Sequence, residues 1–169
     1  EVLVDGVNVK DYSLEKLRER VSMVLQKNVL FSGSIASNLR WGNEYATDEE
    51  IAAAAKSAQA DGFVGSMKDG YDTILDQGGT NVSGGQKQRT AIARTLLEHA
   101  PIMVFDDALS AVDAKTDEAI RGRLREAAGG STLILIAHRV ATLMQADQII
   151  VLDEGKIVGK GTHEELLKN

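Results

Sequence analysis

Apolar residues follow two patterns along this chain: short continuous runs, which are typical of buried strands, and the spacing of one face of a helix. Three short apolar runs, at residues 21–25, 102–105 and 132–137, have the length and composition of buried strands. A helical pattern follows each run. Strands that alternate with helices favour a mostly parallel sheet with both faces covered. The chain is therefore expected to have an α/β fold.

Two β-hairpins are predicted from tight turns between apolar positions. Valines at positions 2, 4, 7 and 9 flank Asp5-Gly6 near the start of the chain. The second hairpin runs along residues 148–152 and returns along residues 156–158, with residues 153–155 as its turn. Asp-Gly and other glycine-containing turns suit hairpins because their residues accept positive φ angles.

Helices are predicted at residues 11–20, 48–59 and 83–99, with a short one after Thr162. Capping boxes begin two of them, Ser83 with Gln86 and Thr162 with Glu165. Most of the section between the first two apolar runs is helical in pattern. We therefore expect residues 27–100 to be a helical subdomain inserted into an α/β core made of residues 1–26 and 101–169.

Composition and charge narrow the classes of function. The 169 residues include no Cys, which excludes disulfides and thiolate metal sites. Lys+Arg 19 and Asp+Glu 25 give a net charge of −6, so the chain lacks the basic character of a nucleic-acid binder and no nucleic-acid partner is expected. The purest apolar run, residues 133–137, is far shorter than the roughly 18 residues that a membrane span needs.

A glycine pair at the start of a predicted helix is the first candidate site. Ser83, Gly84, Gly85 and Gln86 leave uncovered backbone N–H groups at a helix N-terminus, where the helix dipole favours phosphate. A capped helix with a flexible entrance is the better explanation of Ser-Gly-Gly taken alone. The longer string SGGQKQR, residues 83–89, is much rarer by chance.

Two carboxylates, Asp106 and Asp107, follow the second apolar run. Ligands of open α/β sheets bind at the carboxyl ends of the strands. Neighbouring side chains on a strand point to opposite faces, so the two acids should differ in role. One could hold Mg²⁺ through a water, and the other could orient an attacking water. A strand that ends in a solvated acidic turn is the alternative.

Three further polar residues are ambiguous when each is taken alone. His138 ends the third run and is either a packed or solvated residue or a hydrogen-bond donor to a γ-phosphate. Gln26 ends the first run and either binds Mg²⁺ through its amide oxygen or simply begins a loop. Asp113, three residues after Ser110, either belongs to the site or only caps the next helix. A polar residue at the end of each of three strands points to a phosphate or metal site.

The ordered set of these motifs resembles the ATP-binding domain of an ABC transporter over essentially the whole chain. The resemblance implies a P-loop NTPase-like core. It makes Gln26 the Q-loop glutamine, Asp106 the Walker B aspartate, Asp107 the residue at the catalytic-carboxylate position and His138 the switch histidine. Ser83 to Gln86 then correspond to the signature, and Ser110 to Asp113 to the D-loop. Residues 26–35, 71–73 and 161–167 look most similar to exporters.

In this family each ATP is held between two domains, by the phosphate loop of one and the signature of the other. The resemblance thus implies ATP and Mg²⁺ as ligands, with Gln26 and Asp106 at the metal, and Asp107 and His138 as catalytic residues. It implies ATP hydrolysis coupled to membrane transport, with a second ATPase domain and a transmembrane domain as partners, at the cytoplasmic face of the cell membrane. A non-transport ABC ATPase, or a catalytically dead regulatory or dimerisation fragment, is the alternative.

The chain departs from the family pattern in two respects. No G-x-x-x-x-G-K-[ST] phosphate loop occurs in it, so we expect a fragment that is inactive alone. Because the strand before that loop is internal to the family's sheet, we also expect two exposed strand edges, much exposed apolar surface, and an isolated chain that is poorly stable or misassembled. Asp107 stands where most members have Glu, which resembles the degenerate half of a heterodimeric exporter. The shorter Asp107 is expected to hold an attacking water poorly.

Overall fold

The computed structural model describes residues 1–168, which divide into two compact units, Glu1–Ile136 and a second one that begins at Ala137. In the first unit, the elements up to the first parallel strand are β1 (Leu3–Val4), β2 (Val7–Asn8), the 3₁₀ turn η1 (Val9–Asp11), α1 (Leu14–Arg20) and β3 (Val21–Val24). The middle section holds β4 (Gly33–Ser34), α2 (Ile35–Arg40), α3 (Asp48–Ser57), α4 (Asp61–Ser66), η2 (Gly70–Asp72), β5 (Ile74–Leu75), η3 (Gln77–Gly79) and α5 (Gly84–Glu98). The unit ends with β6 (Ile102–Asp106), α6 (Ala114–Ala127) and β7 (Thr132–Ile136).

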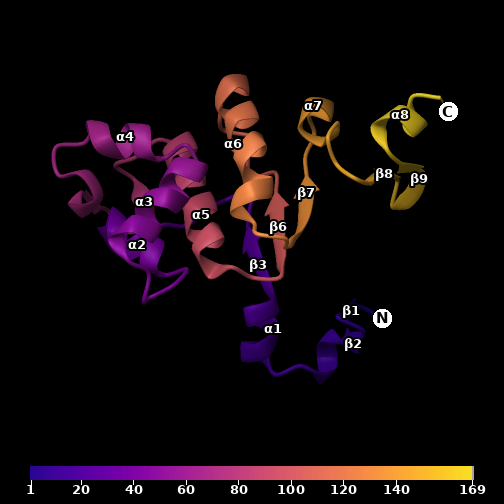
Figure 1. Ribbon diagram of the computed structural model, residues 1–169, viewed down its shortest axis with the longest axis horizontal. Helices are drawn as coiled ribbons and strands as arrows, with labels where there is room; N and C mark the ends of the chain where they lie inside the picture. Colours follow the sequence, from indigo (N-terminus) through magenta and orange to yellow (C-terminus); the bar gives the residue numbers. More distant parts are fainter. Residues whose placement is uncertain (169) are drawn as a thin grey trace. The chain divides into compact units, whose positions relative to one another are not determined.

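A parallel three-stranded sheet in the order β3-β6-β7 forms the centre of the first unit (Figure 1). Its register pairs Val24 with Phe105 and Phe105 with Leu135. The three carboxyl ends therefore lie at one edge of the sheet, and α6 makes the crossover from β6 to β7. The predicted α/β fold with a parallel sheet is confirmed.

One face of this sheet is covered on all three strands, whereas the other is buried only on the central strand, at Val104. Val24, Met103 and Phe105 belong to the hydrophobic core, and Leu133 and Leu135 pack against it. The side chains of the opposite face are largely exposed on the two outer strands: Met23 is 51%, Ile134 45% and Ile136 50% exposed. The prediction of three strands with both faces covered is therefore wrong for β3 and β7. Within the first unit no helix covers the second face at these three positions.

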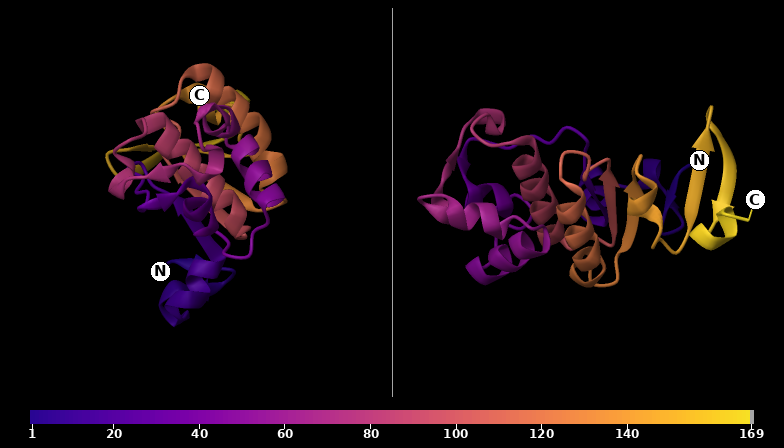
Figure 2. Two further views of the ribbon diagram at one scale, coloured as in Figure 1. Left: turned by 90° about the vertical axis from the view of Figure 1, so that its left-hand side faces the viewer. Right: turned by 90° about the horizontal axis from the view of Figure 1, so that it is seen from above.

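The segment between β3 and β6 is mostly helical and packs around α5. Helices α2, α3 and α4 gather on the far side of α5 from the sheet (Figures 1 and 2). Two arginines bind the carboxyl end of α3: Arg123 of α6 donates to the carbonyl of Lys56, and Arg89 of α5 donates to that of Gln59, both at 2.9 Å. One hydrophobic cluster runs from Val24 through these helices to Ala128.

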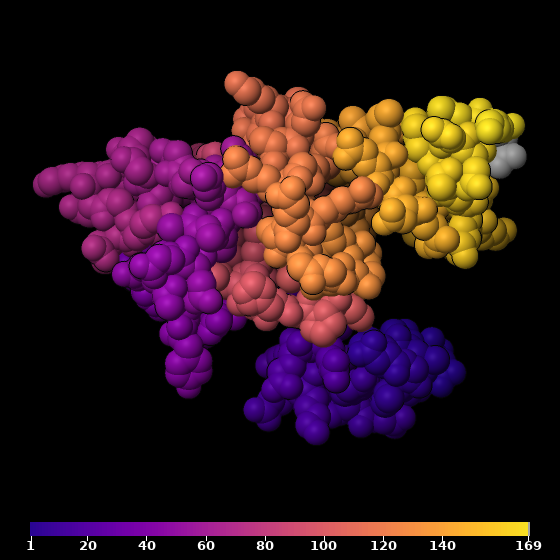
Figure 3. Space-filling view, in the orientation of Figure 1, coloured from indigo at the N-terminus to yellow at the C-terminus, as the bar shows by residue number. Residues whose placement is uncertain are grey.

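Local signals predicted most of these boundaries. The first hairpin is confirmed: Asp5 and Gly6 have φ angles of 49° and 76°, as its tight turn requires. The helix predicted at residues 11–20 begins later than expected, because Ser13 caps it by accepting a hydrogen bond from the Lys16 N–H at 3.3 Å. No residue of α1 is buried, and the N-terminal segment that contains this helix protrudes from the rest of its unit (Figure 3).

The second unit contains α7 (Val140–Leu143), β8 (Ile149–Asp153), β9 (Lys156–Gly161) and α8 (His163–Leu166). Strands β8 and β9 form the predicted antiparallel hairpin, which turns at Glu154 and Gly155. The capping box of Thr162 and Glu165 begins α8, as predicted. No helix in the described part of the chain is both long and apolar enough to pass through a membrane.

The exposed sheet face leads to a prediction about the 169-residue chain. Ile134→Thr together with Ile136→Thr should lower its binding of a hydrophobic dye, since both side chains already contact water. The free energy of unfolding, from urea denaturation, should change by less than about 1 kcal/mol. Ile92→Ala, at a fully buried position of α5, is the control and should cost about 2–5 kcal/mol. An equal loss in both variants would mean that this face is covered.

Candidate functional site

The amino end of α5 offers backbone donors to an anion. Ser83 is its N-cap, and its Oγ accepts a hydrogen bond from the Gln86 N–H at 3.3 Å. Gln86 Oε1 in turn accepts from the Ser83 N–H at 2.8 Å, so the predicted capping box is confirmed. The N–H groups of Gly84 and Gly85 have no acceptor among residues 1–168. Two free donors and the positive end of the helix dipole therefore face outward together.

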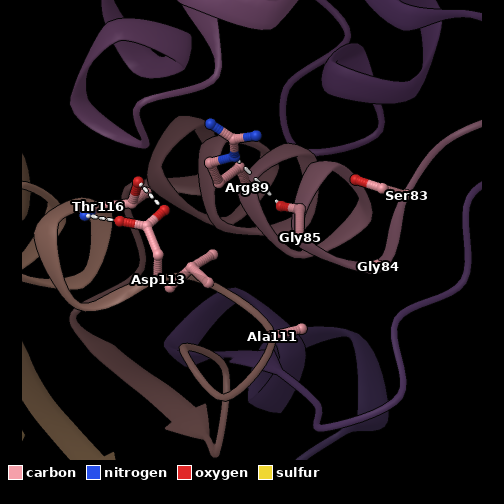
Figure 4. Close-up of a pocket in the computed structure, with 8 residues that line it drawn as sticks. Ser83, Gly84, Gly85, Arg89, Ala111, Asp113 and Thr116 are labelled. Carbon is pink, nitrogen blue, oxygen red and sulfur yellow. Dashed lines mark hydrogen bonds between the residues drawn. The ribbon is translucent and has the colours of Figure 1, made fainter.

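A surface depression of about 380 Å³ lies between this helix end and the loop that precedes α6 (Figure 4). Its lining includes Ser83, Gly84, Gly85 and Arg89 on one side and Ala111 and Asp113 on the other. The two sides approach closely, because a Cβ atom at Gly85 would lie only 2.9 Å from the carbonyl oxygen of Ala111. Glycine at position 85 is what permits this contact between backbones.

Arg89 places a fixed cation beside the depression. Its Nε donates to the carbonyl of Gly85 at 3.2 Å, and its guanidinium lies 4.9 Å above the centre of the Phe63 ring. Burial lowers the pKa of Arg89 from its usual value, while the charges of Asp113 and Asp61 act in the opposite direction. An arginine stays protonated in proteins, so the cation remains.

Asp113 caps α6. Its carboxylate accepts from the Thr116 N–H at 3.0 Å and from the Thr116 hydroxyl at 2.6 Å (Figure 4). These hydrogen bonds, with the hydroxyl first, lower the pKa of the Asp113 carboxyl. The capping role is thus observed, and the lining of the depression by Asp113 is compatible with the D-loop role, which stays a prediction.

The two acids after the second apolar run differ in backbone conformation. Strand β6 ends at Asp106, and Asp107 has a φ of 48°, in the left-handed region. The expectation that both acids project from one strand to opposite faces is therefore wrong, because Asp107 has left the strand. A left-handed φ is uncommon for a non-glycine residue, and such strain concentrates at functional sites.

Hydrogen bonds fix Asp107 between the ends of the two neighbouring strands. Its N–H donates to the carbonyl of Ile136 at 2.9 Å, and its Oδ2 accepts from Gln26 Nε2 at 3.0 Å. Gln26 and Asp107 are 81 positions apart in sequence. The parallel register thus brings together two of the residues predicted to act in the site.

The oxygen donors here fit Mg²⁺ bound together with a phosphate ligand. Asp106 supplies a carboxylate and Gln26 an amide oxygen, and within residues 1–168 no three His, Asp or Glu side chains gather as a metal site. Mg²⁺ typically takes one or two protein ligands and completes its shell with waters and phosphates. The donor set therefore suits an ion that arrives with its substrate.

His138 belongs to the second unit, where it is exposed in a bend before α7. Its predicted role at a γ-phosphate stays a prediction. Ser110 lies in the loop after β6, and its hydroxyl donates to the carbonyl of Asp107 at 2.8 Å.

Sequence reasoning missed Gln88, which is buried and contacts that loop. Its signal was its place on the buried stripe of α5, one turn before Ile92 and two turns before Thr95. A polar residue at such a position needs a hydrogen-bond partner.

Comparisons with known proteins show the family to which this chain is related. A family model described as ABC transporter matches residues 1–110. An uncharacterized ABC transporter ATP-binding protein of Mycobacterium tuberculosis is 48% identical over 98% of this chain, and an ATP-dependent lipid A-core flippase of Mannheimia succiniciproducens is 44% identical over 99% of it. The chain spans 29% of the length of each of these relatives. A solved bacterial Atm1-family ABC exporter with ATP bound superposes with a TM-score of 0.92 and 40% identity, over 98% of this chain and 29% of that one.

The two glycines of the helix end should respond differently to an added methyl group. Gly85→Ala should destabilise the chain by about 1–3 kcal/mol, since the new Cβ would press on the Ala111 backbone. Gly84→Ala has ordinary space, 3.8 Å from the Ala111 Cβ, and should change stability by less than about 1 kcal/mol. Urea denaturation followed by circular dichroism measures both. Equal stability of the two variants would show that residues 85 and 111 are not in close contact.

Proposed function

Because the chain belongs to the ABC transporter family, we propose that it is part of the ATP-binding domain of an exporter and serves ATP hydrolysis coupled to movement of a substrate across a membrane. The observation that carries the proposal is the amino end of α5. It presents the free N–H groups of Gly84 and Gly85 beside the Ser83 hydroxyl at an exposed surface. Such an end suits the phosphates of a nucleotide held mainly by a second ATPase domain.

The edge of the sheet would serve a second nucleotide, held by this chain's own domain. We assign Gln26 and Asp106 to a magnesium ion, which when bound would offset the negative charge of the phosphates. We assign Asp107 to an attacking water, because its carboxylate lies at the carboxyl end of the central strand. His138 would donate a hydrogen bond to the γ-phosphate.

The geometry of Asp107 supports slow hydrolysis at that second site. Its carboxylate is one methylene shorter than that of the usual Glu, and Oδ2 already accepts a hydrogen bond from Gln26. One of its two oxygens is thus occupied, and the other reaches less far toward a water. We propose that this chain completes a partner's competent site and hydrolyses slowly in its own, as in the degenerate half of a heterodimer.

The helical segment is the proposed contact with the transmembrane domain. We propose that residues 27–100 form a helical subdomain, and residues 1–26 and 101–169 the α/β core. Phe31 and Trp41 stack with their ring centres 4.7 Å apart, and both are exposed, at 43% and 66%. Exposed aromatic side chains of this kind suit a protein interface. The domain would then lie at the cytoplasmic face of the cell membrane.

A nucleotide titration tests the shared site. The 169-residue chain is titrated with a fluorescent ATP analogue, alone and mixed with a complete ATP-binding domain that carries a phosphate loop. The chain should increase affinity for the analogue only when the complete domain is present. Ser83→Ala should reduce this gain in affinity by about tenfold or more, as expected for a lost hydrogen bond to a charged group. Ser66→Ala, at an exposed position of α4, is the matched control. Equal binding with and without the chain would contradict the proposal.

The role of Asp107 is tested in the full-length transporter assembled with its partner. Asp107→Glu should raise the ATP turnover by about tenfold, because a positioned general base contributes factors of about 10²–10⁴ and the shorter acid realises only part of this. Asp107→Asn should lower turnover below the unmodified level. A turnover that is the same in all three proteins would show that Asp107 plays no part in hydrolysis.

A further inference from the structure

Gln88 is a buried polar side chain that none of the assigned roles uses. It lies one turn into α5 and is only 5% exposed. Its Oε1 accepts from the Ala111 N–H at 2.9 Å, and its Nε2 donates to the Ser110 hydroxyl at 3.2 Å. Both ends of the amide therefore bind the loop between β6 and α6, more than twenty positions along the chain.

The direction of each hydrogen bond follows from the chemistry of the partners. A backbone N–H can only donate, so the amide oxygen must face Ala111 and the amide nitrogen must face Ser110. The Ser110 hydroxyl has one hydrogen and gives it to the carbonyl of Asp107 at 2.8 Å. Gln88 of α5 thus donates to the Ser110 hydroxyl, and that hydroxyl donates to the backbone carbonyl of Asp107, so the two hydrogen bonds run in the same direction.

We propose that Gln88 is a positioning residue that holds residues 110–111, and through them Asp107, at a fixed place relative to the amino end of α5. Its effect on catalysis rests on the proposed function. In that scheme the helix end contacts the partner's nucleotide and Asp107 acts on this chain's own. Gln88 lies between the two, so it ties the geometry of one site to the other. Gly85 also lies close to the Ala111 carbonyl of the same loop, so the loop has little space to move toward α5.

Gln88→Glu in the full-length transporter separates positioning from packing. The variant keeps the size and the oxygen that faces Ala111. Its second oxygen replaces a donor, so the single hydrogen of Ser110 can no longer serve both the side chain at position 88 and Asp107. We expect kcat to fall about tenfold while KM for ATP stays within about twofold, the signature of a lost contribution to the chemical step.

Thr90→Val is the matched control for this measurement. Thr90 is also buried on α5, 3% exposed, but its hydroxyl bonds to Gln86 of the same helix and not to the loop. It should leave kcat near the unmodified value. An unchanged kcat in Gln88→Glu, or an equal fall of kcat in Thr90→Val, would overturn the proposal.

Hydrogen–deuterium exchange provides a readout that needs no ATPase activity. Gln88→Met keeps the volume but offers no acceptor to the Ala111 N–H, so exchange over residues 107–116 of the full-length protein should rise at least about fivefold, while α3 stays unchanged. Unchanged exchange in that loop would overturn the positioning role. If the unmodified transporter hydrolysed no ATP, the proposed function would fail, and the exchange result would still decide the role of Gln88.

Discussion

Parallel pairing of β6 between β3 and β7 is the constraint on which the rest of the first unit depends. Evenly spaced hydrogen bonds place the ends of all three strands at one edge. The chain leaves that edge at Gln26 and returns to it only at Asp107, after the helical segment. The 3.0 Å contact between these two side chains is thus a consequence of strand register and not of any local sequence preference.

The features that the sequence could predict are those decided within a few residues. The capping box of Ser83 and Gln86 and the turn at Asp5-Gly6 each depend on groups no more than three positions apart. The polar residues that follow the apolar strands could also be chosen as candidate site residues from the sequence, because ligands bind at the carboxyl edge of a parallel sheet. Neither inference required knowledge of which helix packs where.

Features that depend on distant partners could not be predicted in the same way. An apolar run has the same pattern whether one or both faces of its strand are covered, so the runs alone could not indicate which side chains, such as Ile134, would be exposed. The left-handed backbone of Asp107 occurs together with hydrogen bonds to Gln26 and Ile136, which lie in other segments of the chain. Gln88 gave only a weak signal, a polar residue on a buried stripe, and its partners lie in another segment of the chain.

The amino end of α5 combines an open surface with a rigid attachment, and both follow from the spacing of a few residues. Ser83 and Gly84 are exposed, so their donors are accessible to a phosphate. One turn later Gln88 is buried and bonded at both ends of its amide, and Arg89 joins the same turn to the carbonyl of Gln59. A helix held in this way loses little further freedom when an anion binds, so most of the interaction energy remains available as affinity. A loop with the same donors would first have to be ordered.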